Sequence, residues 1–203
     1  MARYTGSKCK QCRRAGEKVC NSAKCGTIKR NYPPGVHGPK NVQRLSDYGT
    51  QLREKQKTKH IYRILEKQFR RYFQNATKAE GDAGENLLRL LESRLDNVVF
   101  RLGFADTRDG ARQYIKHKHI AIDGKKVSIP SYNVKPGQKI NIVSSSTNKQ
   151  IFKDLAKTMA KKQVPGWLEL KPKDKEGIVK HLPQKDDLNV GVDSQLIVEY
   201  YSR

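Results

Sequence analysis

The chain has 203 residues, with 42 Lys and Arg against 20 Asp and Glu, which gives a formal net charge of +22 and an isoelectric point near 10.0. A charge of this size indicates a polyanionic partner, most commonly a nucleic acid. No apolar run approaches the roughly 18 residues of a membrane span, and the N-terminal MARYTGSK lacks the hydrophobic core of a secretory signal. We therefore expect a cytoplasmic protein without membrane contact, whose thiols stay reduced.

All four cysteines lie in one basic stretch near the N-terminus, CKQCRRAGEKVCNSAKC. Cys9 and Cys12 form a C-x2-C pair, and Cys20 and Cys25 form a C-x4-C pair. Four thiolates at this spacing predict one structural zinc ion, because a catalytic zinc would keep an open position for water. Two disulfides or free thiols are the alternative. The stretch has too few apolar residues for a core, so the metal would supply its folding energy, on the order of 10 kcal/mol.

The segment NYPPGVHGPKNVQR, residues 31–44, is rich in proline and glycine. This composition predicts an extended path rather than a helix or a strand. The segment is either a flexible linker or an arm that becomes ordered along RNA. His37 within it is an alternative metal ligand that four cysteines do not require.

Helical patterns begin at Ser46, a residue type that caps helix N-termini. The helix formers LREKQK at 52–57 follow, and apolar residues then recur at helical spacing. We expect the aromatic residues here to be core residues, since RNA-stacking aromatics usually lie on exposed platforms; they are Tyr62, Phe69, Tyr72 and Phe73. The leucines and valines of 87–102 predict a second long helix, ended by Gly103.

A mixed pattern of helix and strand follows. Thr107 is placed to cap a helix over 108–118, on which Arg108, Arg112 and Lys116 fall at i, i+4 and i+8 and would form one basic edge. Asp123-Gly124 predicts a tight hairpin turn within IAIDGKKVSI, and NVKPGQKINIV at 133–143 predicts a strand, a turn and a second strand. The alternative for these charges is a solvated face without a partner.

These residues carry a family resemblance. Residues 94–140, from RLDNVVFRLGF to NVKPGQKI, resemble the small RNA-binding module of ribosomal protein S4, which also occurs in pseudouridine synthases, tyrosyl-tRNA synthetases and heat-shock RNA binders. The surrounding stretches YPPGVHG, LREKQK, LLESRLDNVV and QLIVEYYSR resemble the bacterial S4 family itself, over essentially the whole chain. The tetracysteine start is similar to that of zinc-bearing members.

The resemblance implies an α+β fold with three parts. They are a zinc-pinned basic arm at 1–45, a helical domain at 46–92 completed by 182–203, and an inserted RNA-binding domain with antiparallel strands at 93–181. WLELKP and GIVKHLP would form a hairpin of the inserted domain, and QLIVEYYSR a short terminal element.

The resemblance also implies a non-enzymatic protein of the small ribosomal subunit. It would bind a multi-helix junction of small-subunit rRNA, nucleate assembly, and lie beside the path by which messenger RNA enters. The implied partners are small-subunit rRNA, neighbouring ribosomal proteins and, as a further expectation, messenger RNA, with zinc as cofactor and no small-molecule substrate.

Basic residues in each part are the candidates for RNA contact. They are Lys8, Lys10, Arg13, Arg14, Lys29, Arg30, Lys40, Arg44, Arg53, Lys55, Lys57, Arg70 and Arg71 in the arm and helical domain, and Arg108, Arg112, Lys116, Lys118, Lys125 and Lys126 in the inserted domain.

Two other protein classes are weaker interpretations. An RNA-modifying or aminoacylating enzyme could carry the same module, but the rest of the chain is short for a catalytic domain, and no nucleophile, paired carboxylates or phosphate loop is visible. A zinc-finger DNA regulator would need a recognition helix and usually a second finger or a dimer.

The chain departs from the family pattern at three places. The spacer between the two cysteine pairs, from Cys12 to Cys20, is shorter than in the zinc-bearing members of the family. Val36 stands where the family usually has Gln, so that a polar contact is lost. Lys118 stands in HKHI where the family usually has Gly, and a left-handed turn after the helix would then carry strain.

Overall fold

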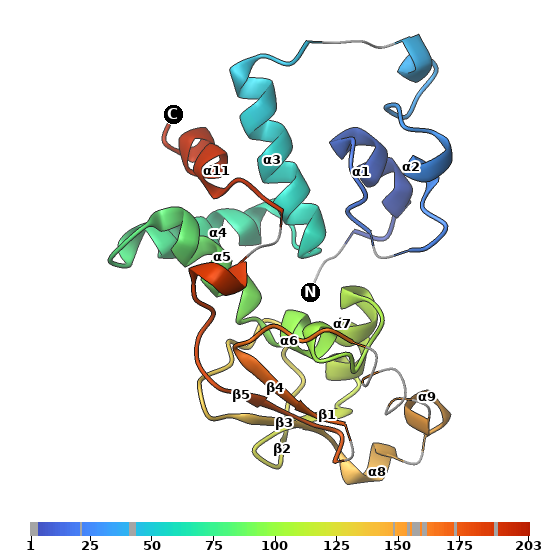
Figure 1. The fold of residues 1–203 in the computed structure, drawn as a ribbon, viewed down its shortest axis with the longest axis vertical. Coiled ribbons are helices and arrows are strands. Elements are labelled where there is room, and N and C mark those ends of the chain that lie inside the picture. The colour runs from blue at the N-terminus through green and yellow to red at the C-terminus, as the bar shows by residue number, and fades with distance from the viewer. Residues whose placement is uncertain are drawn as a thin grey trace. The chain divides into compact units, whose positions relative to one another are not determined.

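The computed structural model describes residues 4–20, 22–40, 44–147, 149–153, 155, 159, 162–172, 174–188 and 191–203. These residues form helices and one five-stranded antiparallel sheet joined by loops, which confirms the predicted α+β fold (Figure 1). The chain divides into two compact units, residues 1–87 with 190–203 and residues 88–189. Among the described helices, none combines the length and apolarity needed to cross a membrane.

The first unit is helical. Its elements are α1 (Lys8–Ala15), α2 (Gly26–Lys29), the 3-10 helix η1 (Gly38–Lys40), α3 (Asp47–Ile61), α4 (Glu66–Lys78) and α11 (Ser194–Tyr201). Ser46 caps α3 as predicted, because its hydroxyl accepts a hydrogen bond of 3.3 Å from the Gly49 amide. The helical spacing that continues past Ile61 does not form one helix, since Arg63 has φ 56° and separates α3 from α4.

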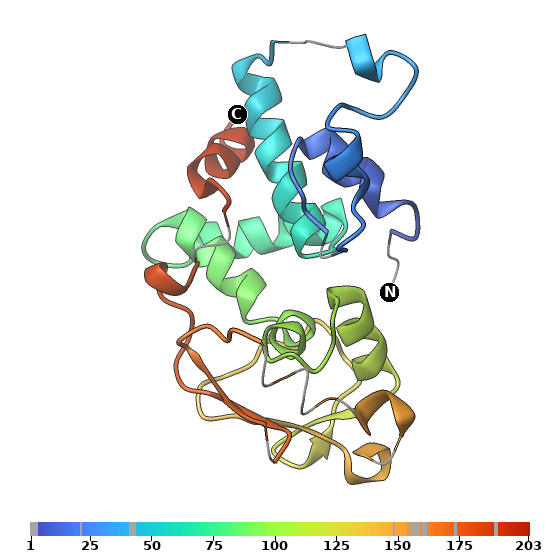
Figure 2. The same ribbon diagram turned by 45° about the vertical axis from the view of Figure 1, so that its right-hand side comes forward.

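Helix α11 completes the first unit by lying beside α3, as Figures 1 and 2 both show. The Tyr201 ring stacks on Phe73 at 4.6 Å between centroids and on Phe69 at 6.2 Å. Phe69, Phe73 and Tyr62 are buried, which confirms their assignment to the core, while Tyr72 is half-buried. The aromatic stripe of this stretch therefore holds the unit together.

Helix α5 (Ala83–Glu92) leads into the second unit, which contains α6 (Leu95–Arg101) and α7 (Arg108–Lys116). The predicted single helix over 87–102 is wrong, because Arg94 has the extended backbone of an N-cap and separates α5 from α6. Apolar spacing continues across this break, so periodicity alone does not reveal it. Gly103, with φ +81°, follows α6 in the left-handed conformation expected after a helix.

The sheet of the second unit has the order β2-β1-β3-β5-β4. Its strands are β1 (Ile120–Ile122), β2 (Lys125–Lys126), β3 (Lys139–Ile142), β4 (Leu168–Lys171) and β5 (Glu176–Val179). The second unit also contains the short helices α8 (Ser144–Thr147), α9 (Gln150–Lys153) and η2 (Lys185–Leu188). The predicted hairpin of WLELKP and GIVKHLP is present as β4 and β5.

The Asp123-Gly124 turn is confirmed. Asp123 has φ 49° and Gly124 has φ 77°, as a two-residue turn between antiparallel strands requires, and Ile122 pairs with Lys125. The strand predicted at the start of 133–143 is not formed: Asn133 makes only an isolated bridge to Arg94, and regular pairing begins at Lys139.

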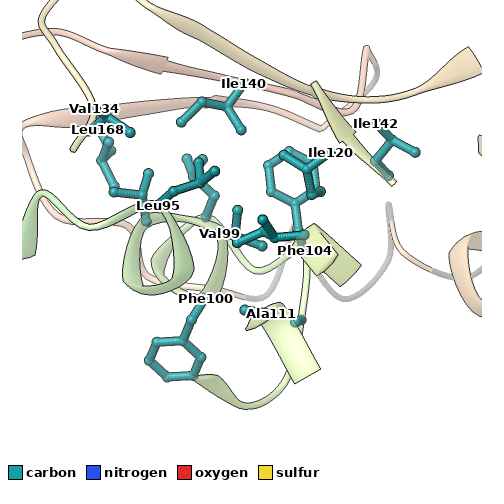
Figure 3. Close-up of a cluster of buried hydrophobic side chains, with 14 of the residues drawn as sticks. Leu95, Val99, Phe100, Phe104, Ala111, Ile120, Val134, Ile140, Ile142 and Leu168 are labelled. Carbon is teal, nitrogen blue, oxygen red and sulfur yellow. The ribbon is translucent and has the colours of Figure 1, made fainter. Parts of the chain in front are cut away.

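The core of the second unit lies between α6, α7 and one face of the sheet (Figure 3). Leu95 and Val99 of α6 lie near Ile140 of β3, and Phe104 lies beneath Ile120 of β1. Trp167 and Met159 are fully buried in the same cluster. Burial on this scale gives the second unit a hydrophobic core of its own.

Candidate cysteine centre and nucleic-acid interface

Three of the four cysteines converge in the first unit. The Sγ atoms of Cys12, Cys20 and Cys25 all lie within 4.8 Å of one another. The amide of Cys20 donates to Cys12 Sγ at 3.3 Å, and Cys25 is the N-cap residue of α2. None of the four cysteines, all of which the structure describes, forms a disulfide, so the disulfide alternative receives no support.

Cys9 lies at the edge of this cluster. Its Sγ accepts a hydrogen bond of 3.5 Å from the amide of Gly26, the residue that follows Cys25. A tetrahedral zinc with Zn–S bonds of about 2.3 Å places sulfur atoms roughly 3.8 Å apart. Three sulfurs already close to that spacing, with a fourth beside them, form a donor set that fits a zinc ion. The exposed His37 is not among the clustered residues.

The thiols differ in their titration without a metal. Burial raises the pKa of Cys12 to about 12. Burial also acts to raise the pKa of Cys25, but hydrogen bonding to Thr27 outweighs it and lowers this pKa to about 7. A metal ion must therefore displace a proton at least from Cys12 at neutral pH, which makes metal binding at this cluster dependent on pH.

Two arginines form hydrogen bonds within the arm and between the arm and α3. The Arg13 guanidinium donates to the carbonyls of Tyr32 and Pro33 at 2.8 and 3.0 Å and lies over the Tyr32 ring. Arg53 Nε of α3 donates to the Ala15 carbonyl at 2.8 Å. Residues 31–33 are thus held against α1 in the protein itself, unlike the extended, unattached path that the prolines suggest.

Most candidate RNA-contacting residues are exposed. In the first unit these are Lys8, Lys10, Arg14, Lys29, Arg30, Lys40, Arg44, Arg70 and Arg71, and in the second unit Lys116, Lys118, Lys125 and Lys126. Arg13, Arg53 and Arg108 are half-buried.

Two lysines of α3 instead have structural contacts. Lys55 is 3% exposed, and its Nζ lies 2.9 Å from Glu66 Oε1 and over the Tyr200 ring at 4.5 Å. Lys57 is 8% exposed and pairs with Glu17 at 2.9 Å. Both ammonium groups neutralise carboxylates within the unit, a role that the sequence pattern did not indicate.

The expected basic edge of α7 does not exist as one surface. Arg112 is 4% exposed and donates through Nε to Asp96 Oδ2 at 3.1 Å. Arg94, fully buried, grips the same carboxylate with two hydrogen bonds of 2.8 and 3.1 Å. Arg108 donates to Asn97 Oδ1 at 2.8 Å and lies 4.4 Å from the centre of the Phe100 ring. Of the predicted edge, only Lys116 is exposed.

Asp96 and Asn97 are the positioning residues that sequence reasoning missed. Their signal is two consecutive polar residues inside the apolar stretch RLDNVVF. A buried carboxylate needs charged or hydrogen-bonding partners. The helical spacing of Arg108, Arg112 and Lys116 cannot reveal that partners on α6 turn the first two inward.

Lys118 occupies the predicted left-handed turn. It has φ 58° and follows His117, the C-cap residue of α7, and its amide donates to the Ile115 carbonyl at 2.9 Å. The next amide, of His119, donates to Tyr114 at 3.0 Å and closes the helix end. The turn exposes the Lys118 side chain beside the start of β1, and Lys125 and Lys126 lie on β2, which pairs with β1.

Comparison with known proteins covers the whole chain. Residues 3–92 match the family described as "Ribosomal protein S4/S9 N-terminal domain", and residues 93–140 match the "S4 domain". Proteins named "Small ribosomal subunit protein uS4" are 48% identical in Thermodesulfovibrio yellowstonii, 46% in Syntrophobacter fumaroxidans and 48% in Syntrophomonas wolfei, each over 100% of both chains. Similarity of this extent, together with the α+β unit that the S4 domain match covers in part, shows that the chain belongs to the uS4 family of ribosomal proteins.

Proposed function

We propose that this protein is a structural constituent of the small ribosomal subunit in the cytoplasm, and that it binds small-subunit rRNA without catalysing a reaction. The observation that carries the proposal is the full-length relationship to proteins named as uS4. The net charge of +22 supports it, because rRNA is the polyanion that such a protein meets in the ribosome.

The finer part of the proposal is the kind of RNA site. We infer a junction where several rRNA helices meet, because exposed basic residues occur in both compact units and on different elements. A protein with several separate basic surfaces can contact more than one RNA backbone. Binding several helices at once would hold them in place early, which is how the protein would nucleate assembly, beside neighbouring ribosomal proteins and the path of messenger RNA.

The RNA surface of the second unit would consist of four lysines that flank β1. Lys116 and Lys118 precede this strand, and Lys125 and Lys126 pair across from it. All four side chains are exposed, and β1 itself is buried. A buried strand flanked by two pairs of exposed ammonium groups suits contact with phosphates, which needs charge more than fixed geometry.

The division into three functional parts is also a proposal. We propose the arm at 1–45, the helical domain at 46–92 with 182–203, and the RNA-binding domain at 93–181. The two compact units support the return of residues 190–203 to the first helices. The core of α6, α7 and the sheet supports an RNA-binding domain that begins near residue 93.

Zinc is the metal that we propose for the cysteine centre. Cys12, Cys20 and Cys25 would hold it together with Cys9, whose sulfur lies beside Gly26. Four thiolates leave no open position, so the ion would supply folding energy to the arm and no chemistry. Elemental analysis of protein purified without chelator under reducing conditions tests this, and one zinc per chain is the expected result.

RNA binding is tested by changing Lys125 and Lys126 together to Gln in the full chain. We expect weaker binding to small-subunit rRNA and a log–log salt slope that is less steep by about 0.7 to 0.9 for each lost phosphate contact. The matched control changes Lys67 and Lys78 of α4, two exposed lysines outside the proposed surface. Equal slopes for both variants, or wild-type protein that does not bind the rRNA, would contradict the proposal.

A further inference from the structure

A groove between α1, residues 31–33 and α3 has not been assigned any role. It consists of two adjoining cavities in the first unit, of about 460 and 280 Å³. Arg14, Leu45 and Arg53 line both cavities and join them. Volumes in this range hold small-molecule groups in proteins, where pockets are typically about 300 to 1,000 Å³.

The smaller cavity has the chemistry of a phosphate site. Three guanidinium groups line it, from Arg13, Arg14 and Arg53, together with Asn31. Arg13 and Arg53 donate to main-chain carbonyls, which fixes their position but leaves their charge uncompensated. In the described part of the chain, none of the three forms an ion pair with a carboxylate. Fixed arginines with spare donors are typical of phosphate recognition.

The larger cavity has a different character. Ala15, Leu45 and Leu52 supply apolar surface, and Gln11, Gln56 and His60 supply planar polar groups. Its one further cation, Lys57, is neutralised by Glu17 and Glu54 at 2.9 and 3.5 Å. An apolar surface with amide and imidazole groups around it suits a flat heterocycle, whose faces are apolar and whose edges carry hydrogen-bonding atoms.

The charge state of His60 agrees with a larger cavity that takes a neutral base rather than a phosphate. Burial first, and then the nearby positive charges of Lys59, Arg63 and Arg14, lower its pKa to about 4. His60 is therefore neutral at pH 7 and offers one donor and one acceptor nitrogen. A neutral imidazole complements a nucleobase edge, whereas a second phosphate would favour a charged one.

We propose that this groove binds a single unpaired nucleotide of the rRNA, with its phosphate among Arg13, Arg14 and Arg53 and its base against Leu45 and Leu52 within reach of Gln56. The inference rests on the proposed rRNA binding and adds a base-reading site to it. Leu45 lines both cavities and is 46% exposed, so a base can cover it. An acidic peptide of a neighbouring protein would use the arginines but leave the apolar cavity without a matching group.

Crosslinking in the full-length protein tests the occupant. A benzoylphenylalanine in place of Leu45 should crosslink on irradiation to one unpaired nucleotide of small-subunit rRNA, which is mapped by reverse transcription. The same residue in place of Leu65, a leucine of similar exposure at the start of α4, is the matched control and should not reach that nucleotide. Crosslinks scattered over many nucleotides, or formed in reconstituted subunits only with another protein, would overturn the proposal.

Two single changes separate the phosphate from the base. Arg14→Gln should lower affinity and reduce the salt slope by about 0.7 to 0.9, as one lost phosphate contact does. Gln56→Ala should lower affinity about fivefold, the effect of roughly one hydrogen bond, without changing the slope. Lys67→Gln in α4 removes the same charge outside the groove.

Failure of the groove proposal can be distinguished from failure of the proposed rRNA binding. If the wild-type protein binds rRNA but both groove variants behave as Lys67→Gln does, the groove proposal fails and rRNA binding stands. If the wild-type protein does not bind rRNA, the proposed function itself fails. Circular dichroism of each variant checks that the helices of the first unit are retained.

Discussion

The N-terminal arm and the second unit are stabilised in different ways. In the arm, the buried apolar side chains are small, such as Cys12, Ala15 and Cys25, while Val36 is 92% exposed. In the second unit, large side chains such as Trp167 and Phe104 are buried in a continuous cluster with the sheet. One chain therefore contains a segment that apolar burial does not hold together and a segment that it does.

The difference shows which contacts take over where a core is missing. The arm depends on thiols that can share a metal and on arginines that donate to main-chain carbonyls, as Arg13 and Arg53 do. These interactions respond to chelators and salt, because they consist of coordinated or charged groups. Apolar contacts in the second unit do not depend on a bound metal, so we expect a chelator to unfold the arm without unfolding the second unit.

Metal removal should have the largest effect, and it should be confined to the arm. Loss of a zinc tetrathiolate removes stabilisation on the order of 10 kcal/mol from the segment that it folds. We expect a chelator to raise amide hydrogen exchange and proteolysis in residues 4–40 and to leave residues 88–153 protected. Cys12→Ser should reproduce the change without a chelator. If the arm stays protected in metal-free protein, the metal does not stabilise the arm and this prediction is wrong.

Truncation of the apolar core should do the reverse. Phe104 is 1% exposed, and Phe104→Ala should cost about 3 to 5 kcal/mol of the unfolding free energy of the second unit, because it leaves a cavity beneath the sheet. Urea denaturation followed by Trp167 fluorescence measures this, since Trp167 lies in the same cluster. The zinc content should remain that of the wild type, and parallel loss of zinc would show that the regions are coupled.

A pH titration tests the ion pairs of the first unit. Partial burial acts to raise the pKa of Glu66, but hydrogen bonds from Lys55, Tyr201 and Lys59 outweigh it and lower this pKa from 4.5 to about 2. Because the folded-state pKa is the lower one, the stabilisation is present above about pH 4.5 and is lost as the pH falls towards 2.

Glu66→Gln should therefore cost about 1 kcal/mol or less at pH 7, since the carboxylate is nearly half exposed and solvent screens its pairs. The cost should vanish near pH 2. Glu80→Gln, an exposed change after α4, is the control and should alter the free energy of unfolding at neither pH. A cost for Glu66→Gln that persisted at pH 2 would assign the effect to packing rather than charge.

Relief of backbone strain at Lys118 should be the smallest effect. Lys118→Gly should stabilise the second unit by about 1 kcal/mol, because glycine adopts φ 58° without the steric cost of a Cβ. Lys118→Ala removes the same ammonium group but keeps the Cβ, and it should not stabilise. Thermal unfolding compares the two, and equal melting temperatures would show that the turn is not strained.

Local signals in the sequence correctly predicted the local structure. Ser46 and Thr107 cap α3 and α7, and Asp123-Gly124 makes the hairpin turn, because each depends on hydrogen bonds or dihedral angles a few residues away. The breaks at Arg63 and Arg94 were not predictable from apolar spacing, which continues through both. They are set by contacts with distant residues, such as the bridge of Arg94 to Asn133.

The candidate site was predictable in its composition but not in its geometry. The spacing of the four cysteines predicted a metal site, and positive charge predicted RNA contact by the lysines of the β1 hairpin. Neither indicates that Arg112 is buried on Asp96, a partner 16 residues earlier, or that Lys55 meets Glu66 of the next helix. A cation is assigned to RNA or to the protein's own carboxylates only by the tertiary fold.

The return of α11 to α3 affects the order in which a nascent chain can fold. Residues 88–189 hold their own sheet and core, so they can fold as soon as they have been synthesised. The first unit, by contrast, has Gln51 bonded to Glu199 and Phe73 stacked on Tyr201, partners that the translating ribosome adds only after the entire second unit. During translation, the helices of the first unit are therefore synthesised before α11 is available to pack on them. The unit that is synthesised first completes its folding last.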